Sequence, residues 1–362
     1  MRFDQIVVGS APGDAITEAA LKLAGALAAI GESDVFAMYP HPELEGRVRP
    51  LRELPSASDA DVTIYHASIG EPELHSLVFH RPGRLILSYH NITPASYFEV
   101  LDPQFAALLR RGRWELRQLA ARAAGAIADS EFNAAELRAL GMELVEVAPP
   151  PLNMSRLLDV TPDPAVRSQL AELPGPLVLV VGQVLPHKRL ELAVAAHHFL
   201  NVNHDADVHL AIVGPHRNHR YTSALIRHVR SLNLQTARIT GEVTDAQLAA
   251  YYRRADVLVV PSEHEGFCVP LVEAFTLGVP VVARDFGAIA ETADGAALVL
   301  SNTSSAPELC EATHRVLTDE ALRFALTRRG SDRAGELTGD RTLHCWLAAF
   351  ARVLRSAGLR LD

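Results

Sequence analysis

The length, composition and charge of the chain indicate an ordinary globular protein and exclude several classes. Its 362 residues exceed what one hydrophobic core usually holds, about 250–300 residues, so we expect two domains. A net charge of -9 argues against a nucleic-acid partner, which would need a basic surface. The three cysteines are scattered and no apolar run approaches the ~20 residues of a membrane span, so we expect a cytoplasmic protein.

In the first half of the chain, short apolar runs alternate with segments of helical periodicity. The predicted strands are Gln5–Val8, Asp34–Tyr39, Val62–Tyr65, Leu85–Tyr89, Ala126–Ala128 and Leu144–Val147. Asp14 can cap a helix that runs to about Ile30, with Gly31 just past its end. Further helices are predicted at Phe105–Ala124 and Ala134–Leu140. This alternation is typical of βαβ units and therefore predicts a parallel sheet.

A proline-rich stretch, residues 149–175, separates this half from a second one with the same alternation and is interpreted as a hinge. The strands predicted after it are Leu177–Val181, Val208–Val213, Arg238–Thr240, Val257–Val260, Val279–Val282 and Ala297–Leu300. We therefore expect one doubly wound α/β domain at residues 1–150 and another at 175–340. Ligands should bind at the carboxyl ends of the strands. Periodicity alone assigns the last helix, Arg341–Ala357, to neither domain.

Residues 262–275 carry the strongest chemical signal. Glu265 and Glu273 stand eight residues apart on either side of Pro270, which suits a helix start because proline has no N–H to leave unpaired. The segment predicts a strand, a loop and a helix N-terminus whose first amides can bind an anion. One carboxylate before this N-terminus and one just inside it could hold hydroxyls on either side of a bound phosphate. A nucleotide sugar requires such an arrangement.

A structural explanation competes for the same residues. Ser262-x-x-Glu265 matches a capping box, and the helix dipole by itself favours Glu273 near a helix start. However, Gly266 and Pro270 would interrupt the helix that the box should begin. The capping box therefore explains Glu265 poorly.

The segment resembles the glutamate-x7-glutamate signature of the family 4 retaining glycosyltransferases, which have the GT-B fold. Four other places match that family in the correct order, namely Tyr89–Pro94, Asp129–Asn133, Pro149–Asn153 and Gly182–Lys188. The resemblance covers nearly the full chain. It implies an α/β GT-B architecture with two Rossmann-like domains facing a central cleft, and a C-terminal helix (341–362) that packs back onto the first domain.

The resemblance also implies roles for particular residues. Glu265 and His90 would orient the sugar and act as the catalytic pair, while Glu273 would hold the ribose and Lys188 the diphosphate. The remaining donor-binding positions would be Gly13, Gln183, Phe267, Cys268 and Val269. The first domain would bind the acceptor, which is a glycan, a lipid-linked sugar or a small molecule. The implied reaction is a same-face, retaining transfer that needs no metal and no cofactor.

One position departs from the family pattern. Gln183 follows Gly182 where the family usually has arginine, so the charged, bidentate fork for phosphate is missing. This loss could weaken donor binding about tenfold to a hundredfold, unless Arg189 compensates as a neighbouring cation. Two alternatives therefore stay open: a sugar-nucleotide-binding partner of another transferase, and a GT-B phosphorylase or sugar-phosphate synthase.

Weaker signals have simpler explanations. Asp59–Asp61 and Asp205–Asp207 look like a metal-binding Asp-x-Asp, but both precede strands and fit turns better. His216 and His219 lie in one loop, yet no carboxylate or cysteine completes a metal set. The arginines of the helix Phe105–Ala124 could contact an anionic membrane, so peripheral membrane contact is possible, although an exposed helical face explains them equally. The Gly-x-Gly-x-x-Gly spacing of NAD-binding proteins is absent.

Overall fold

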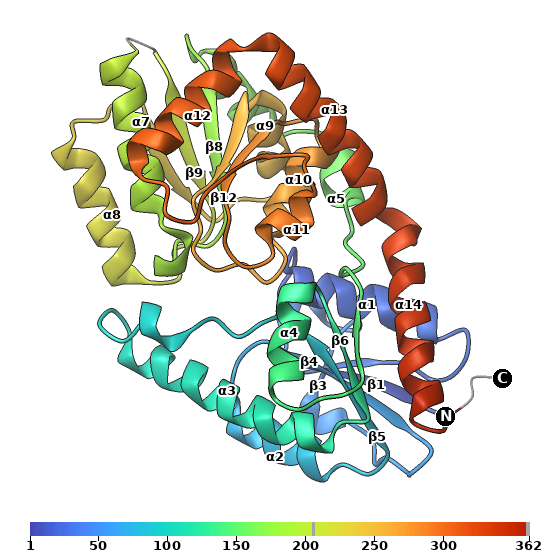
Figure 1. Ribbon diagram of the computed structural model, residues 1–362. Coiled ribbons are helices and arrows are strands. Elements are labelled where there is room, and N and C mark those ends of the chain that lie inside the picture. The colour runs from blue at the N-terminus through green and yellow to red at the C-terminus, as the bar shows by residue number, and fades with distance from the viewer. Residues whose placement is uncertain (205–206, 360–362) are drawn as a thin grey trace. The chain divides into compact units, whose positions relative to one another are not determined.

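The computed structural model describes residues 1–204 and 207–359 and divides the chain into two compact units. The first unit comprises Met1–Asn153 together with the chain from Leu337 onward, and the second comprises Met154–Glu336. Each unit is built on one parallel sheet with helices on its faces, as Figure 1 shows. The predicted fold class, two Rossmann-like α/β domains, is confirmed.

The sheet of the first unit has the strand order β3-β2-β1-β4-β5-β6-β7. Its strands are β1 (Phe3–Gly9), β2 (Val35–Tyr39), β3 (Arg49–Pro50), β4 (Val62–Ala67), β5 (Arg84–Tyr89), β6 (Gly125–Ala128) and β7 (Val145–Val147). Tyr89 of β5 lies opposite Ala67 of β4 and Ala128 of β6. The residues that follow these strands therefore emerge together at the carboxyl edge of the sheet.

The helices of the first unit are α1 (Ala15–Leu27), α2 (Pro72–His80), α3 (Pro103–Arg122), α4 (Glu131–Ala139) and α14 (Gly339–Ser356), with 3-10 turns at Pro42–Leu44, Leu51–Glu53 and Ala95–Tyr97. Asp14 caps α1 as predicted, because its carboxylate accepts a hydrogen bond from the amide of Thr17 at 2.9 Å. The helix ends at Leu27 rather than near Ile30. Gly31 is needed for a different reason, since a Cβ there would lie 2.6 Å from the carbonyl oxygen of Met1.

Helix α14 belongs to the first unit although it follows the whole of the second in sequence. Trp346 and Phe350 of this helix are buried in one core cluster with Phe3 of β1 and Ile64 of β4. The rings of Phe3 and Phe350 meet edge to face, with centroids 5.9 Å apart. Such aromatic burial contributes strongly to stability, so α14 is an integral part of this unit.

The sheet of the second unit has the order β10-β9-β8-β11-β12-β13. Its strands are β8 (Leu177–Val181), β9 (His209–Val213), β10 (Ala237–Gly241), β11 (Val257–Val260), β12 (Val281–Arg284) and β13 (Leu298–Leu300). Strand β12 begins two residues later than predicted. Val279 instead completes the end of the preceding helix, where its amide donates to the carbonyl of Ala274 at 2.8 Å.

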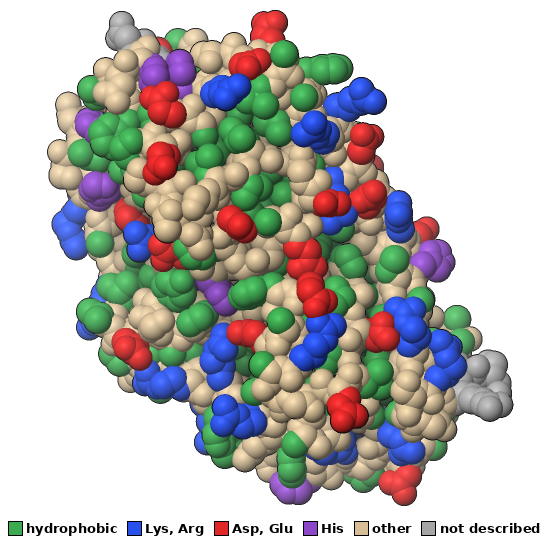
Figure 2. Space-filling model, viewed as in Figure 1, with side chains coloured by type: hydrophobic (Ala, Val, Ile, Leu, Met, Phe, Trp, Pro, Cys, Tyr) green, Lys and Arg blue, Asp and Glu red, His purple; other side chains and the backbone are tan. Residues whose placement is uncertain are grey.

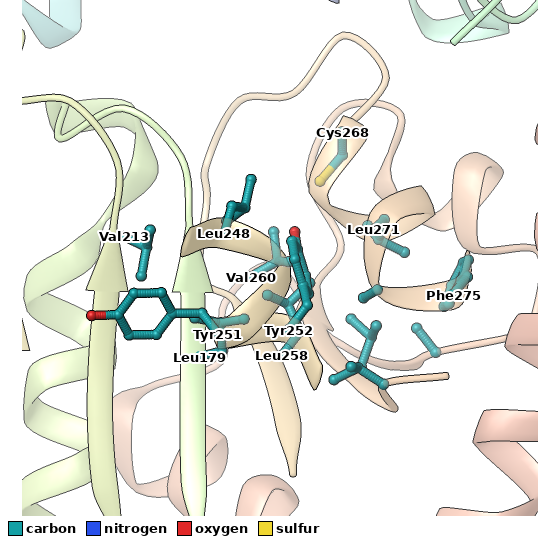
Figure 3. Close-up of a cluster of buried hydrophobic side chains, with 14 of the residues drawn as sticks. Leu179, Val213, Leu248, Tyr251, Tyr252, Leu258, Val260, Cys268, Leu271 and Phe275 are labelled. Carbon is teal, nitrogen blue, oxygen red and sulfur yellow. The ribbon is translucent and has the colours of Figure 1, made fainter. Parts of the chain in front are cut away.

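The helices of the second unit are α5 (Ser155–Leu158), α6 (Pro164–Ala171), α7 (Leu190–Asn203), α8 (His219–Ser231), α9 (Asp245–Arg254), α10 (Val269–Thr276), α11 (Ile289–Ala293), α12 (Ala306–Thr318) and α13 (Glu320–Leu337), with a 3-10 turn at Pro186–Lys188. Most of the proline-rich stretch lies in this unit, because α5 and α6 both contact α9. Figure 3 shows the core beside them, where Tyr252 of α9 lies near Leu271 and Phe275 of α10.

The surface offers no single-sign patch on the face shown in Figure 2, where basic and acidic side chains are interspersed. Across residues 1–204 and 207–359, none of the helices combines the length and apolarity that crossing a bilayer demands. Peripheral membrane contact stays a prediction.

Candidate functional site

The loops that follow β8, β11 and β12 of the second unit bring together a buried ion pair. Lys188, in the turn after β8, donates to Oε1 of Glu265, in the loop after β11, at 2.7 Å. Both side chains are largely buried, with 17% and 9% exposed. Burial opposes the charged form of Lys188, but the charge of Glu265, the nearby Cys268 and the hydrogen bond to Glu265 together outweigh it and raise the pKa of this ammonium. Lys188 is therefore a cation that requires an anionic partner.

The backbone of Glu265 is fixed by the loop after β12. The amide of Ala288 donates to the carbonyl of Glu265 at 2.9 Å. Gly287 has φ of 62°, and a Cβ at that position would lie 2.2 Å from the same carbonyl oxygen. Only glycine permits this approach, so Gly287 contributes to the position of Glu265.

Helix α10 begins one residue earlier than predicted, with Val269 as its first residue and Pro270 as its second. Its N-cap is Cys268, which has left-handed backbone angles (φ 73°) and no side-chain cap bond. The capping-box explanation of Glu265 is therefore wrong. Burial and the charge of Glu265 raise the pKa of the Cys268 thiol well above its usual value, so the thiol is neutral and is not a nucleophile.

Glu273 lies on the buried face of α10, and both of its carboxylate oxygens have partners. Tyr252 donates to Oε2 at 2.7 Å, and the guanidinium of Arg156 pairs with Oε1. Arg156 also donates to Asp245 at 2.5 Å. A ribose that bound here would have to share Glu273 with Tyr252 and Arg156.

The other predicted donor residues differ in their surroundings. Gln183 is exposed at the end of β8, and Phe267 is buried, with its carbonyl accepting from Thr292 at 2.6 Å. Arg189, the candidate substitute cation, forms ion pairs with Glu191 at 2.9 Å and with Glu263 at 3.6 Å. Its charge is thus already balanced by these carboxylates.

In the first unit, the residues that follow β5 and β6 form a second polar site. His90 Nδ1 lies 2.8 Å from Asp129 Oδ2, and only 6% of the His90 side chain is exposed. On its other side, His90 Nε2 lies 2.9 Å from Nδ1 of His66, which comes from β4. Gly13, in the loop after β1, has φ of 71°, a conformation that favours glycine.

Several weaker sequence signals now have structural explanations. The Asp61 carboxylate accepts from the amide of Ser58 and from the amide of Arg2, both at 2.8 Å, so it stabilises a turn. Asp205 and Ala206 lie outside the described residues. Four of the arginines of α3 have partners within the unit: Arg110 with Glu99, Arg111 with Glu115, Arg113 with Glu136, and Arg122 with backbone carbonyls.

The sequence patterns did not identify Arg156, Tyr252, His66 or Gln5. Arg156 and Tyr252 lie 117 and 21 residues from Glu273, so no local spacing connects them to it. Gln5 and His66 do carry a signal, because each is a polar residue inside a run of buried strand residues. A buried polar side chain needs a hydrogen-bonding partner, and that requirement could have marked both.

A comparison with protein families finds a match over part of the chain. Residues 164–333 match the family described as "Glycosyl transferases group 1". The match lies wholly within the second unit, which carries Lys188, Glu265 and Glu273.

The chain is also similar to individual relatives and to solved structures. The chain is 41% identical over 113 residues to a GDP-mannose-dependent alpha-mannosyltransferase of Mycolicibacterium smegmatis. The aligned segment covers 31% of this chain and 26% of that protein. The chain spans between 22% and 59% of the length of the curated relatives compared with it.

Among solved structures, sucrose-phosphate synthase from Thermosynechococcus elongatus superposes with a TM-score of 0.75 at 20% identity, covering 98% of this chain and 99% of that one. The Anabaena protein HepE in complex with UDP-glucose gives 0.74 at 15% identity, covering 98% and 99%. These likenesses show the fold. The group 1 match concerns residues 164–333, a little under half of the chain.

Proposed function

We propose that the chain is a retaining glycosyltransferase that moves a sugar from a nucleotide-sugar donor to an acceptor hydroxyl. The observation that carries this proposal is the buried Lys188–Glu265 pair beside the N-terminus of α10. A phosphate suits a lysine and a helix N-terminus, and a sugar hydroxyl suits a carboxylate. The group 1 match of this unit supports the assignment.

Donor binding would exchange the partners of this pair. A buried ammonium needs an anion, which Glu265 supplies in the structure and which the donor diphosphate would supply when bound. Glu265 would then be released to accept hydrogen bonds from the sugar. In this proposal Glu273 holds the ribose, Lys188 and the α10 amides hold the diphosphate, and Phe267 and Gln183 complete the donor site.

Transfer would proceed on one face of the sugar, with the leaving diphosphate taking the acceptor proton. Negative charge grows on the leaving oxygen, and the fixed cation and helix N-terminus stabilise it. These groups supply the positive charge, so we propose that no metal ion and no other cofactor takes part. In the first unit, His90 is proposed to contact the reacting sugar, and its loops to bind the acceptor. We keep the cytoplasm as the expected compartment.

The first experiment measures nucleotide release from a panel led by GDP-mannose and UDP-glucose, the nucleotide sugars that the names of a relative and of a solved neighbour contain. Thermal stability is read on the same samples. Release with one donor that disappears in Glu265→Ala, but not in the exposed control Glu320→Ala, supports the proposal. The anomeric configuration of the product, read by NMR, tests retention, and activity in EDTA tests metal independence.

A second function has one specific observation in its favour. Gln183 is exposed at the end of β8 and lacks the charge that family members carry there, so the chain could bind a sugar nucleotide without transferring it. A thermal shift with a donor, combined with no release in the presence of any glycan, lipid-linked or phosphate acceptor, would favour this binding protein. Release only with inorganic phosphate would favour a phosphorylase.

A further inference from the structure

A continuous chain of buried polar side chains crosses the sheet of the first unit. Gln5 of β1 donates from its amide nitrogen to the carbonyl of Ala20 in α1 at 2.8 Å. Its Oε1 lies 2.9 Å from Nε2 of His66, and Nδ1 of His66 lies 2.9 Å from Nε2 of His90. The chain ends at Asp129, 2.8 Å from Nδ1 of His90.

The position of every proton in this chain follows from its fixed end. A backbone carbonyl only accepts hydrogen bonds, so the amide nitrogen of Gln5 faces Ala20 and its oxygen faces His66. Nε2 of His66 must therefore carry a proton. His66 is fully buried, and burial, assisted by the neighbouring His90, lowers its pKa well below the usual value, so its ring is neutral. Nδ1 of His66 is then a bare nitrogen that accepts.

His90 faces acceptors on both sides. The bare Nδ1 of His66 requires a proton on Nε2 of His90, and the carboxylate of Asp129 takes a proton on its Nδ1. The two rings are within 3° of parallel with centroids 5.2 Å apart, which fits an in-plane N–H···N bond between them. Ser88 Oγ, 3.3 Å from Nε2 of His90, can share the same proton.

We propose that Gln5 and His66 are positioning residues that hold His90 in its doubly protonated form, with a proton on each ring nitrogen. His90 then has no lone pair, so it cannot act as the base that takes the acceptor proton. It acts instead as a fixed imidazolium, paired with Asp129, beside which negative charge can develop. The catalytic part of this inference rests on the proposed function.

The protonation states are tested directly, without substrate, by nitrogen NMR of the histidine-labelled protein at pH 7. His90→Gln and His66→Leu identify the two sets of signals. We expect two protonated nitrogens in His90, and in His66 a protonated Nε2 with a bare Nδ1. A bare nitrogen in His90, or a proton on Nδ1 of His66, overturns the proposal. The protonation states are read from the wild-type protein, and the variants serve only to assign its signals. One folded variant is enough, because loss of either ring identifies its own signals and shifts those of the ring bonded to it.

The positioning role is tested by two replacements of His66. Asparagine keeps an acceptor oxygen close to the place of Nδ1, whereas leucine removes it. We expect kcat to fall at least about tenfold in His66→Leu with little change in the KM for the donor, and to recover largely in His66→Asn. Equal rates in the two variants, with matched circular dichroism and thermal unfolding, contradict a positioning role. If the wild type turns over no donor, the proposed function fails. The NMR result still determines the protonation states of His66 and His90.

Discussion

The candidate sites of the two units hold their buried polar side chains by different means. In the second unit, opposite charges face one another directly, Lys188 with Glu265 and Arg156 with Glu273. In the first, Gln5 and His66 lead from a backbone carbonyl to the contact between His90 and Asp129. A direct charge pair can exchange one partner for a ligand anion, whereas a chain fixed to the backbone keeps its arrangement. We infer that the site of the second unit rearranges on binding and that the site of the first is preorganised.

Breaking the charge pair of the second unit should have the largest effect. Glu265→Ala leaves Lys188 buried without an anion, which typically costs about 3–5 kcal/mol, so urea unfolding of the free protein should show a loss of that order. Saturating donor or pyrophosphate should restore part of the loss, because it supplies the missing anion. The control is the double variant Glu265→Gln with Lys188→Met, which removes both charges and leaves no unpaired ammonium. If this double variant loses as much stability as Glu265→Ala, the ion pair is not what stabilises the site.

The buried side chain of His197 predicts that the free energy of unfolding falls in acid. Burial lowers the pKa of His197 in α7 to about 4, so below pH 6.5 the unfolded chain binds a proton that the folded chain does not. Stability is complete above pH 6.5 and falls by about 3 kcal/mol as the pH approaches 4. Urea unfolding at pH 7 and pH 4.5 measures this. In His197→Gln the free energy of unfolding should depend less on pH. If its difference between pH 7 and pH 4.5 equals that of the wild type, His197 is not the cause of the acid instability.

A smaller effect is expected from removing the hydrogen bond between Tyr252 and Glu273. Tyr252→Phe removes one hydrogen bond to a buried carboxylate and should lower the free energy of unfolding by about 1.5–3 kcal/mol. Tyr251→Phe is the matched control, because Tyr251 lies on the same helix and its hydroxyl has no carboxylate partner among the described residues. Similar losses in the two variants would show that the bond to Glu273 contributes little.

The smallest effect concerns the exposed position that departs from the family pattern. Gln183→Arg adds a charged donor at the carboxyl edge of the second sheet and should tighten nucleotide binding about tenfold, as measured by calorimetry. Gln235→Arg adds the same charge before β10, at the opposite edge, and should change affinity little. Equal affinities for both variants would show that position 183 does not face the phosphates.

The strands could be predicted from the sequence far better than the contacts between them. Buried parallel strands are continuous apolar runs, so β8 and β11 were predicted to the residue. Glu265 is positioned by Gly287, and His66, which contacts His90, is positioned by Gln5; both partners lie far away along the chain. Such partners are set by the tertiary structure, and the spacing of residues along the sequence does not predict them.

The end of α1 shows the same limit on a smaller scale. The apolar pattern and Gly31 together suggested a helix to about Ile30, yet the helix stops at Leu27. The glycine is required by the carbonyl of Met1, which approaches from a neighbouring segment. Gly31 is therefore required by a tertiary contact and does not mark the end of the helix.

The placement of α14 sets an order of events during synthesis on the ribosome. The sheet of the first unit is made early, but Trp346 and Phe350, which cover its apolar face, are made only after residues 154–336. The second unit can therefore complete its core while the face around Phe3 and Ile64 is still open to water. The unit begun first is finished last, and in that interval it is the part of the nascent chain most exposed to chaperones and to aggregation.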